Sequence, residues 1–111
     1  SKWGVSEATT LQYMFSAATS FNGDVSKWEV SKVTSLEATF YDAKMFDRDL
    51  SKWVVSKVTT LYFTFAGYVA NVVFNQDLSK WDISRVTTLS STFKKAIHFN
   101  QVRRRKSCYY Q

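Results

Sequence analysis

The sequence predicts an α/β repeat fold, a right-handed leucine-rich-repeat-like solenoid with one short parallel strand and one helix per coil. The first observation is a repeat of about 25 residues, because Trp3, Trp28, Trp53 and Trp81 are 25, 25 and 28 residues apart. The second is that each copy passes from alternating apolar residues to helical spacing. Self-similarity of this period is typical of arrays whose copies bury their apolar faces against one another.

Four imperfect copies and a tail divide the chain, and they cover residues 1–25, 26–50, 51–78, 79–101 and 102–111. The last of these segments is basic and does not follow the repeat. The chain opens inside a repeat at Ser1 and has no initiator methionine, so we expect a processed or truncated form. Missing targeting signals therefore carry no information.

Each copy begins with a predicted strand. In the second copy Trp28 and Val30 are apolar and Glu29 between them is charged, the period-2 alternation of a half-buried strand. The same apolar rows recur in the other copies at Trp3 and Val5, Trp53 and Val55, and Trp81 and Ile83. Pairing of like strands predicts a parallel sheet along the stack.

A predicted helix follows the strand. Val33, Leu36, Phe40 and Ala43 stand at i, i+3, i+7 and i+10, which places one apolar stripe along a helix. Thr34 stands at the start of the stripe, where its hydroxyl would cap the free backbone N–H groups. The equivalent threonines are Thr9, Thr59 and Thr87.

The return segment of each copy is a predicted turn, because phenylalanine is followed there by Asn or Asp, which favour turns. The positions are Phe21-Asn22, Phe46-Asp47, Phe74-Asn75 and Phe99-Asn100. Further carboxylates two residues on, Asp24, Asp49 and Asp77, give the oxygen spacing that a hard cation such as Ca²⁺ uses. The pattern matches no full calcium loop, so we predict no metal site and no cofactor, and leave Ca²⁺ binding open.

The runs FNGDVSKWEVSKVTSLEATF and FNQDLSKWDISRVTTLSSTF closely resemble the BspA-like leucine-rich-repeat surface proteins, in their mycoplasma-lipoprotein-type repeat. The resemblance covers residues 1 to about 101. It implies a leucine-rich-repeat-like solenoid on a microbial surface, without enzymatic activity and with adhesive or protein-binding roles. It brings no common catalytic site.

Charge argues against a nucleic-acid-binding body. The formal net charge is +6, but Arg103, Arg104, Arg105 and Lys106 supply +4 of it, which leaves 11 basic and 9 acidic residues over 1–101. Nucleic acid is therefore the partner we least expect, since a binding body carries a basic face of its own. No apolar run reaches membrane-spanning length.

Lysines of the strand segments form one candidate binding row. If Trp and Val point inward, then Lys27, Lys52 and Lys80 point outward as a ladder of like charge. Such a row either binds an anionic partner or is simply solvated, since repulsion at water-like dielectric is only about 1 kcal/mol.

Two further segments are candidate contacts. The tail residues Arg103, Arg104 and Arg105 stand next to Tyr109 and Tyr110, a mixture that suits an acidic protein or an anionic membrane as well as a solvated end. The third repeat is three residues longer, and its apolar insertion is either a contact patch or extra core. That insertion contributes Tyr68, Val69, Val72 and Val73.

Catalytic residues are scarce, so we predict no enzyme. His98 is the only histidine, Cys108 is the only cysteine, and neither recurs in another copy. We expect a protein-binding or adhesion module of an extracellular or cell-surface protein. The alternative is a structural subunit of an intracellular or organellar assembly, docked through the open ends and the basic tail. In both cases neighbouring repeats or subunits are expected at the open ends.

Overall fold

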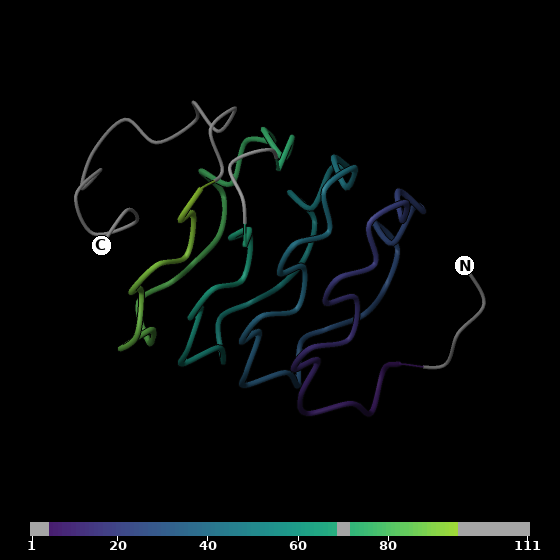
Figure 1. The fold of residues 1–111 in the computed structure, drawn as a ribbon. Helices are drawn as coiled ribbons and strands as arrows, with labels where there is room; N and C mark the ends of the chain where they lie inside the picture. The colour runs from purple at the N-terminus through teal and green to yellow at the C-terminus, as the bar shows by residue number, and fades with distance from the viewer. Residues whose placement is uncertain (1–4, 69–71, 96–111) are drawn as a thin grey trace.

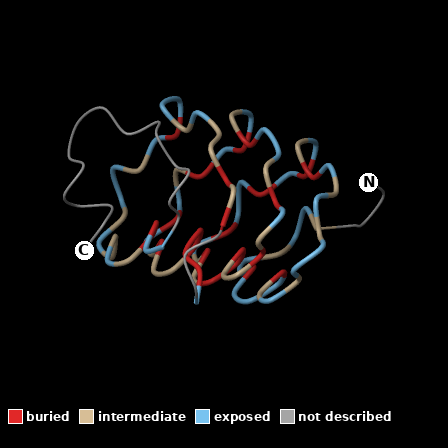
Figure 2. Ribbon diagram, turned by 45° about the horizontal axis from the view of Figure 1, so that its top comes forward, coloured by how far each residue is buried: buried red, intermediate tan, exposed pale blue. Residues whose placement is uncertain are grey.

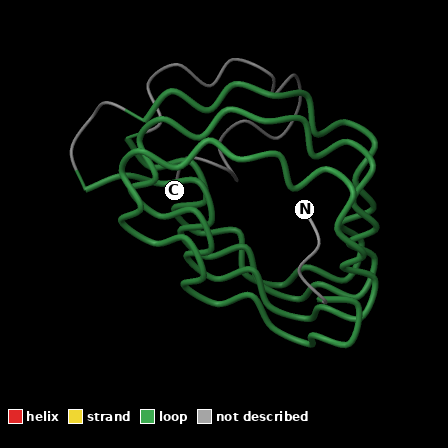
Figure 3. Cartoon of the chain, turned by 90° about the vertical axis from the view of Figure 1, so that its right-hand side faces the viewer, coloured by secondary structure: helices red, strands yellow, loops and turns green. Residues whose placement is uncertain are grey.

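The computed structural model describes residues 5–68 and 72–95. These residues contain no helix and no strand, and Figure 3 draws them as loops and turns. The β-pairing within this described part of the chain consists of three isolated parallel bridges, Thr10–Ser35, Ser35–Thr60 and Thr60–Thr88. The prediction of a leucine-rich-repeat-like α/β solenoid, with a strand and a helix in each coil, is therefore wrong.

Successive copies of the repeat nevertheless lie side by side (Figure 1). Backbone hydrogen bonds join residues about one repeat apart. The amide of Leu36 donates to the carbonyl of Thr60 at 3.2 Å, and the amide of Ala38 donates to the carbonyl of Tyr62 at 2.8 Å. The radius of gyration is 12.6 Å, close to the roughly 13 Å of a compact chain of this length.

The amides of Phe40 and Asp42 also donate to the third repeat, whereas the amides that alternate with Ala38, Phe40 and Asp42 bond inside their own repeat. The amide of Thr39 donates to Leu36 at 3.2 Å, and that of Tyr41 donates to Ala38 at 3.1 Å. Both hydrogen bonds close four-residue turns. An α-helix needs every amide to bond four residues back, so a segment that sends alternate amides to its neighbour cannot be helical.

Backbone dihedrals interrupt the predicted helix directly. Ala38 has φ 53° and Asp42 has φ 57°, both in the left-handed region that a right-handed helix excludes. The same rows are left-handed in other repeats, at Tyr13, Ala17, Phe63, Ser91 and Lys95. The repeat, and not one unusual residue, therefore sets this conformation.

The predicted helix caps have another role. The Thr34 hydroxyl donates to the carbonyl of Thr9 at 3.2 Å, and the Thr59 hydroxyl donates to the carbonyl of Thr34 at 3.2 Å. These exposed threonines therefore link repeats along the surface. The parallel bridges lie one residue further on, in the segment for which the sequence had indicated a helix.

The predicted strand segment keeps its alternation without forming a strand. Trp28 and Val30 are buried and Glu29 is exposed, as the period of two requires. The indole makes a hydrogen bond to a residue about one repeat length earlier: Trp53 Nε1 donates to the carbonyl of Val25, the last residue of the first copy, at 2.9 Å. Trp81 Nε1 makes the equivalent bond to Leu50 at 2.8 Å.

Aromatic rings fill the core, and Figure 2 shows the buried residues along the inside of the stack. One column of parallel rings runs through neighbouring repeats, with centroids 5.5 to 5.7 Å apart, and contains Phe15, Phe40, Phe65 and Phe93. A second column, at 5.7 and 5.9 Å, contains Phe21, Phe46 and Phe74. Within a repeat the two columns stack on each other, as Phe40 and Phe46 do at 4.1 Å.

Candidate binding surface

Positions that differ between the repeats are the place to look for a site, because positions common to all copies are accounted for by stacking. Two adjacent rows carry a different residue in each of the four copies. The first holds Gln12, Glu37, Tyr62 and Ser90, and the second holds Tyr13, Ala38, Phe63 and Ser91. The first and third repeats carry aromatic or large polar residues at both rows, the second carries Glu37 and the buried Ala38, and the fourth carries serine at both.

Three rings from these rows and the next turn form a cluster. The centroid of Phe63 lies 4.3 Å from that of Tyr62 and 5.5 Å from that of Tyr41, at interplanar angles of 47° and 57°. All three side chains are half-buried. We call Tyr13, Tyr41, Tyr62 and Phe63, together with Glu37, the aromatic corner.

Glu37 connects Tyr13 to this surface. The hydroxyl of Tyr13 donates to Glu37 Oε2 at 3.1 Å, and Gln12 Nε2 donates to Glu37 Oε1 at 3.1 Å. Both carboxylate oxygens are therefore held in fixed orientation by the first repeat. The hydrogen bond to Glu37, followed by the charge of that carboxylate, raises the pKa of Tyr13 above 10.0. Tyr13 remains 57% exposed, so its ring is available to a partner.

The backbone of the corner is strained. Tyr13 has φ 62° and Phe63 has φ 57°, a region that costs a residue with a Cβ roughly 1–2 kcal/mol. Ala38 and Ser91 adopt the same conformation in their repeats. Bulky aromatic residues are rare in this region, so Tyr13 and Phe63 are unusual occupants of a row that is left-handed in all four copies.

The insertion of the third repeat separates into exposed and buried residues. Tyr68 is 76% exposed, and its amide donates to Asp42 Oδ1 at 3.2 Å. Val72 is 1% exposed and belongs to the core, so it is not part of a surface patch. Val73 is half-buried and its amide donates to the Lys44 carbonyl at 3.1 Å, while Val69 lies outside the described residues.

Lys27, Lys52 and Lys80 are all exposed along the tryptophan face. A hollow of about 520 Å³ lies beside the first two, and its lining includes Glu29 and the exposed Val54. The charges of Lys52 and Lys80 contribute to lowering the pKa of nearby Asp49, after the larger effect of hydrogen bonds from Ser51. Glu29 and Asp49 make this face mixed in charge rather than a purely cationic ladder.

Other sequence candidates lie elsewhere. Arg103, Arg104 and Arg105, together with His98 and Cys108, fall outside the described residues. Among the residues that are described, no group of three or more His, Cys, Asp or Glu side chains is placed to hold a metal ion.

The Asn and Asp oxygens of the turns accept backbone hydrogen bonds. Asn22 Oδ1 accepts from the amide of Asp47 at 2.9 Å, and Asp47 Oδ1 accepts from the amide of Asn75 at 3.0 Å. Asp49 Oδ1 accepts from the amide of Ser51 at 2.9 Å. These oxygens therefore tie repeats together and close turns.

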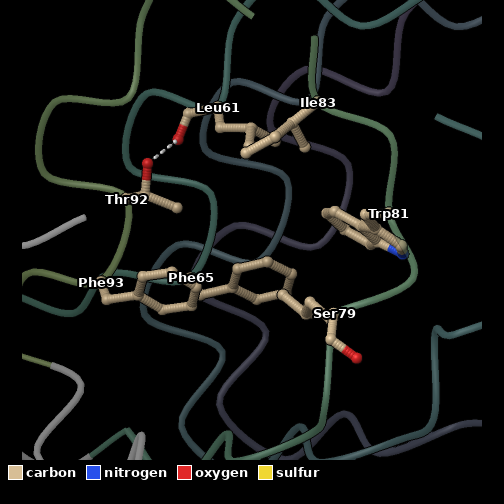
Figure 4. A pocket seen from close by; sticks show the side chains of 8 residues that line it. Leu61, Phe65, Ser79, Trp81, Ile83, Thr92 and Phe93 are labelled. Atoms are coloured by element: carbon tan, nitrogen blue, oxygen red, sulfur yellow. Dashed lines mark hydrogen bonds between the residues drawn. The ribbon is translucent and has the colours of Figure 1, made fainter. Parts of the chain in front are cut away.

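A smaller hollow of about 110 Å³, whose lining includes Ser79 and Thr92, lies between the third and fourth repeats (Figure 4). The rings of Phe65, Phe93 and Trp81 line it, together with Leu61 and Ile83. Charged side chains are absent from its lining. This hollow is a gap in the packing of the core near the end of the stack.

Sequence reasoning missed the aromatic corner because a helix was expected there. On a helix Tyr62 and Phe63 would have been two separate positions beside the apolar stripe, with no relation to Tyr41. The signal that was available is the contrast between copies, Tyr-Phe in the third against Ser-Ser in the fourth.

Comparison with known proteins identifies the family. No curated protein and no solved structure matches this chain. No helix among residues 5–68 and 72–95 is long and apolar enough to cross a membrane. A family model matches residues 1–73 and 68–105, which is most of the chain. The chain therefore belongs to the family described as "Mycoplasma protein of unknown function, DUF285".

Proposed function

We propose that this chain is a non-enzymatic protein-binding module that holds its partner on the aromatic corner. The observation that carries the proposal is the gathering of Tyr41, Tyr62 and Phe63, from two repeats, into one accessible cluster. Tyrosine and other aromatic side chains are enriched at the energetic centres of protein interfaces. Packing of the repeats does not require them, since the fourth repeat has serine at the two equivalent rows.

The chemistry of the corner favours a partner with an arginine or lysine at the contact. Glu37 presents a carboxylate whose orientation is fixed by Tyr13 and Gln12. A guanidinium placed beside it would form a charge-assisted hydrogen bond and would also contact aromatic faces. Fixing the carboxylate in advance lowers the entropy that binding must offset.

A place on a microbial or other cell surface is part of the proposal. Family membership supports it, because this family is associated with BspA-like surface repeat proteins. The location is checked by labelling unpermeabilised cells with an antibody against the chain. Signal that appears only after permeabilisation would favour the alternative, a structural subunit inside the cell or an organelle.

The binding site is tested with the double substitution Tyr62→Ser/Phe63→Ser. It gives the third repeat the residues of the fourth, where Ser91 already adopts φ 58°, so the fold should be kept. Tyr68→Ser is the matched control, because it removes a more exposed tyrosine outside the corner. Proteins captured by immobilised chain are compared by quantitative mass spectrometry.

A partner that is retained by the wild type and by Tyr68→Ser, and reduced at least tenfold with the double variant, supports the site. Its affinity should fall further with Glu37→Gln if the contact is cationic. A partner bound equally by all variants would contradict the proposal, and equal melting temperatures confirm that folding was not the cause.

A further inference from the structure

Hydrogen bonds between the repeats have a direction. Leucine amides donate to the following repeat, from Leu11 to Ser35 at 3.1 Å, and from Leu61 to Thr88 at 2.8 Å. In the described part of the chain, the fourth-repeat amide of Leu89 donates to no residue. At the other end, the first-repeat carbonyl of Thr10 accepts from none.

The next pair of positions repeats this arrangement. Ser91 occupies the row of Ala38, whose amide donates to Tyr62, yet the Ser91 amide has no acceptor among the described residues. The carbonyl of Gln12, in the row of Tyr62, has no donor there. One end thus presents donors, and the other presents acceptors with the same two-residue spacing.

A second kind of backbone hydrogen bond between repeats runs in the opposite direction and fits the same head-to-tail arrangement. The amide of Thr87 donates to the carbonyl of Thr59 at 2.8 Å, toward the preceding repeat. By the same rule the amide of Thr9 would donate to the carbonyl of Thr87 in a molecule placed before it. The two edges of the described stack are therefore complementary to each other, not each to itself.

Apolar side chains are also less covered at the ends. In the second and third repeats Val33 and Val58 are each 1% exposed, whereas the equivalent Val86 in the fourth is only half-buried. Ala8, the equivalent residue in the first repeat, is half-buried too. Stacking the last repeat on the first would complete the burial of both.

Charge favours the same arrangement. Lys32 Nζ lies 2.7 Å from Glu7 Oε1, so neighbours in this row form an ion pair. The row continues with Lys57 and ends in Arg85. Arg85 at one end would therefore meet Glu7 at the other.

We propose that a second copy of this chain stacks head to tail, with the fourth repeat of one molecule against the first repeat of the next. Such an interface is heterologous, because the two molecules contribute different surfaces, and it leaves one open edge on each molecule of a pair for a further copy. Unpaired backbone edges are templates for this kind of pairing.

Cysteine cross-linking tests both the contact and its polarity. Thr9 and Thr87 are exposed and would be neighbours across the interface, as Thr9 and Thr34 are within the molecule. Neighbouring parallel segments lie about 4.8 Å apart, within the range of a disulfide. In a Cys108→Ser background, a mixture of Thr9→Cys and Thr87→Cys chains should form a mixed disulfide dimer under mild oxidation.

The controls are Thr9→Cys alone, Thr87→Cys alone and Thr34→Cys alone. Thr34 is an exposed position of the same row inside the stack. Each alone should give at least tenfold less dimer than the mixture. Dimers of Thr9→Cys with itself, or a mixture that cross-links no better than the controls, would overturn the proposal. So would sedimentation as a single monomer up to about millimolar concentration.

Charge reversal gives a second measurement. Arg85→Glu should weaken self-association by roughly two- to tenfold, the range of one or two exposed ion pairs. Lys57→Glu makes the same change of charge inside the stack and should leave association unchanged. Adding Glu7→Arg to Arg85→Glu should restore association, and failure of that rescue would exclude the proposed register.

Discussion

At the scale of single residues, threonine hydroxyls hold the repeats together from inside as well as outside. Thr39, Thr64 and Thr92 are completely buried. The hydroxyl of Thr64 donates to the carbonyl of Leu36 at 2.8 Å, and that of Thr92 donates to Leu61 at 2.9 Å. A buried carbonyl without a hydrogen-bond partner is costly, so the hydroxyls of this buried row stabilise the contact between neighbouring repeats.

Replacing Thr64 with valine tests this row. The change keeps the shape and removes the donor to Leu36, so the free energy of unfolding should fall by about 1–2 kcal/mol. Thr59→Val removes a similar but exposed bond, of 3.2 Å, and should cost less than about 0.5 kcal/mol. Urea unfolding measures the free energy of unfolding of both variants. Equal decreases would contradict the claim that the buried hydroxyl contributes more than the exposed one.

Asp49 makes stability depend on pH. The hydrogen bond from the Ser51 backbone amide, with help from the Ser51 hydroxyl, lowers the pKa of Asp49 below 3.8. Because the folded chain favours the ionised form, its contribution is present above pH 3.8 and is lost as pH falls through the lower folded pKa.

Asp49→Asn keeps an acceptor but does not titrate. The difference in melting temperature between the wild type and this variant should therefore shrink from about pH 6 to about pH 3. A difference that stays constant over this range would show that ionisation of Asp49 plays no part.

At the scale of the element, the unit of the structure is a run of tight turns that sends alternate amides to the next repeat. The sequence correctly predicted the burial of Val33, Leu36 and Phe40, because an apolar pattern reports which side chains are inside. It did not predict the backbone path, since turns can bury the same positions as a helix. The composition argued against a helix, because VTTLYFTF in the third copy consists largely of poor helix formers.

Glycine substitution distinguishes the turn from a helix, because the change in the free energy of unfolding has a different sign in the two cases. Ala17 is exposed with φ 60°, so Ala17→Gly should relieve strain and raise the free energy of unfolding by about 0.5–1 kcal/mol. Its neighbour Ala18 has no positive φ, and Ala18→Gly should lower it by roughly the same amount. A helix would be destabilised by both changes.

The indole row supports neighbouring repeats in pairs. Trp53 is 3% exposed, stacks parallel to Trp81 at 6.5 Å and bonds to Val25. Trp53→Ala should therefore cost roughly 3–5 kcal/mol, measured by chemical unfolding. Val54→Ala, at the exposed position beside it, is the control and should change stability by less than about 0.5 kcal/mol.

At the scale of the whole molecule, bonds between repeats carry the fold and differences between repeats carry the binding surface. Period and core rows could be predicted from the sequence, because each copy repeats them. The aromatic corner could not, because Tyr41 and Phe63 come together only through a turn and a neighbouring copy. The exposed position of Lys27, Lys52 and Lys80 followed from the inward tryptophan row, whereas the hollow beside Lys27 and Lys52 required the structure.

Hydrogen exchange of the monomer tests most directly whether contacts between repeats form this fold. Leu36 and Ala38 bond to the third repeat, whereas Leu89 and Ser91, in the same rows, have no acceptor among the described residues. At a concentration too low for self-association, we predict slow exchange for the first two amides and fast exchange for the last two. Equal protection in the second and fourth repeats, as a local helix in each copy would give, would contradict the account.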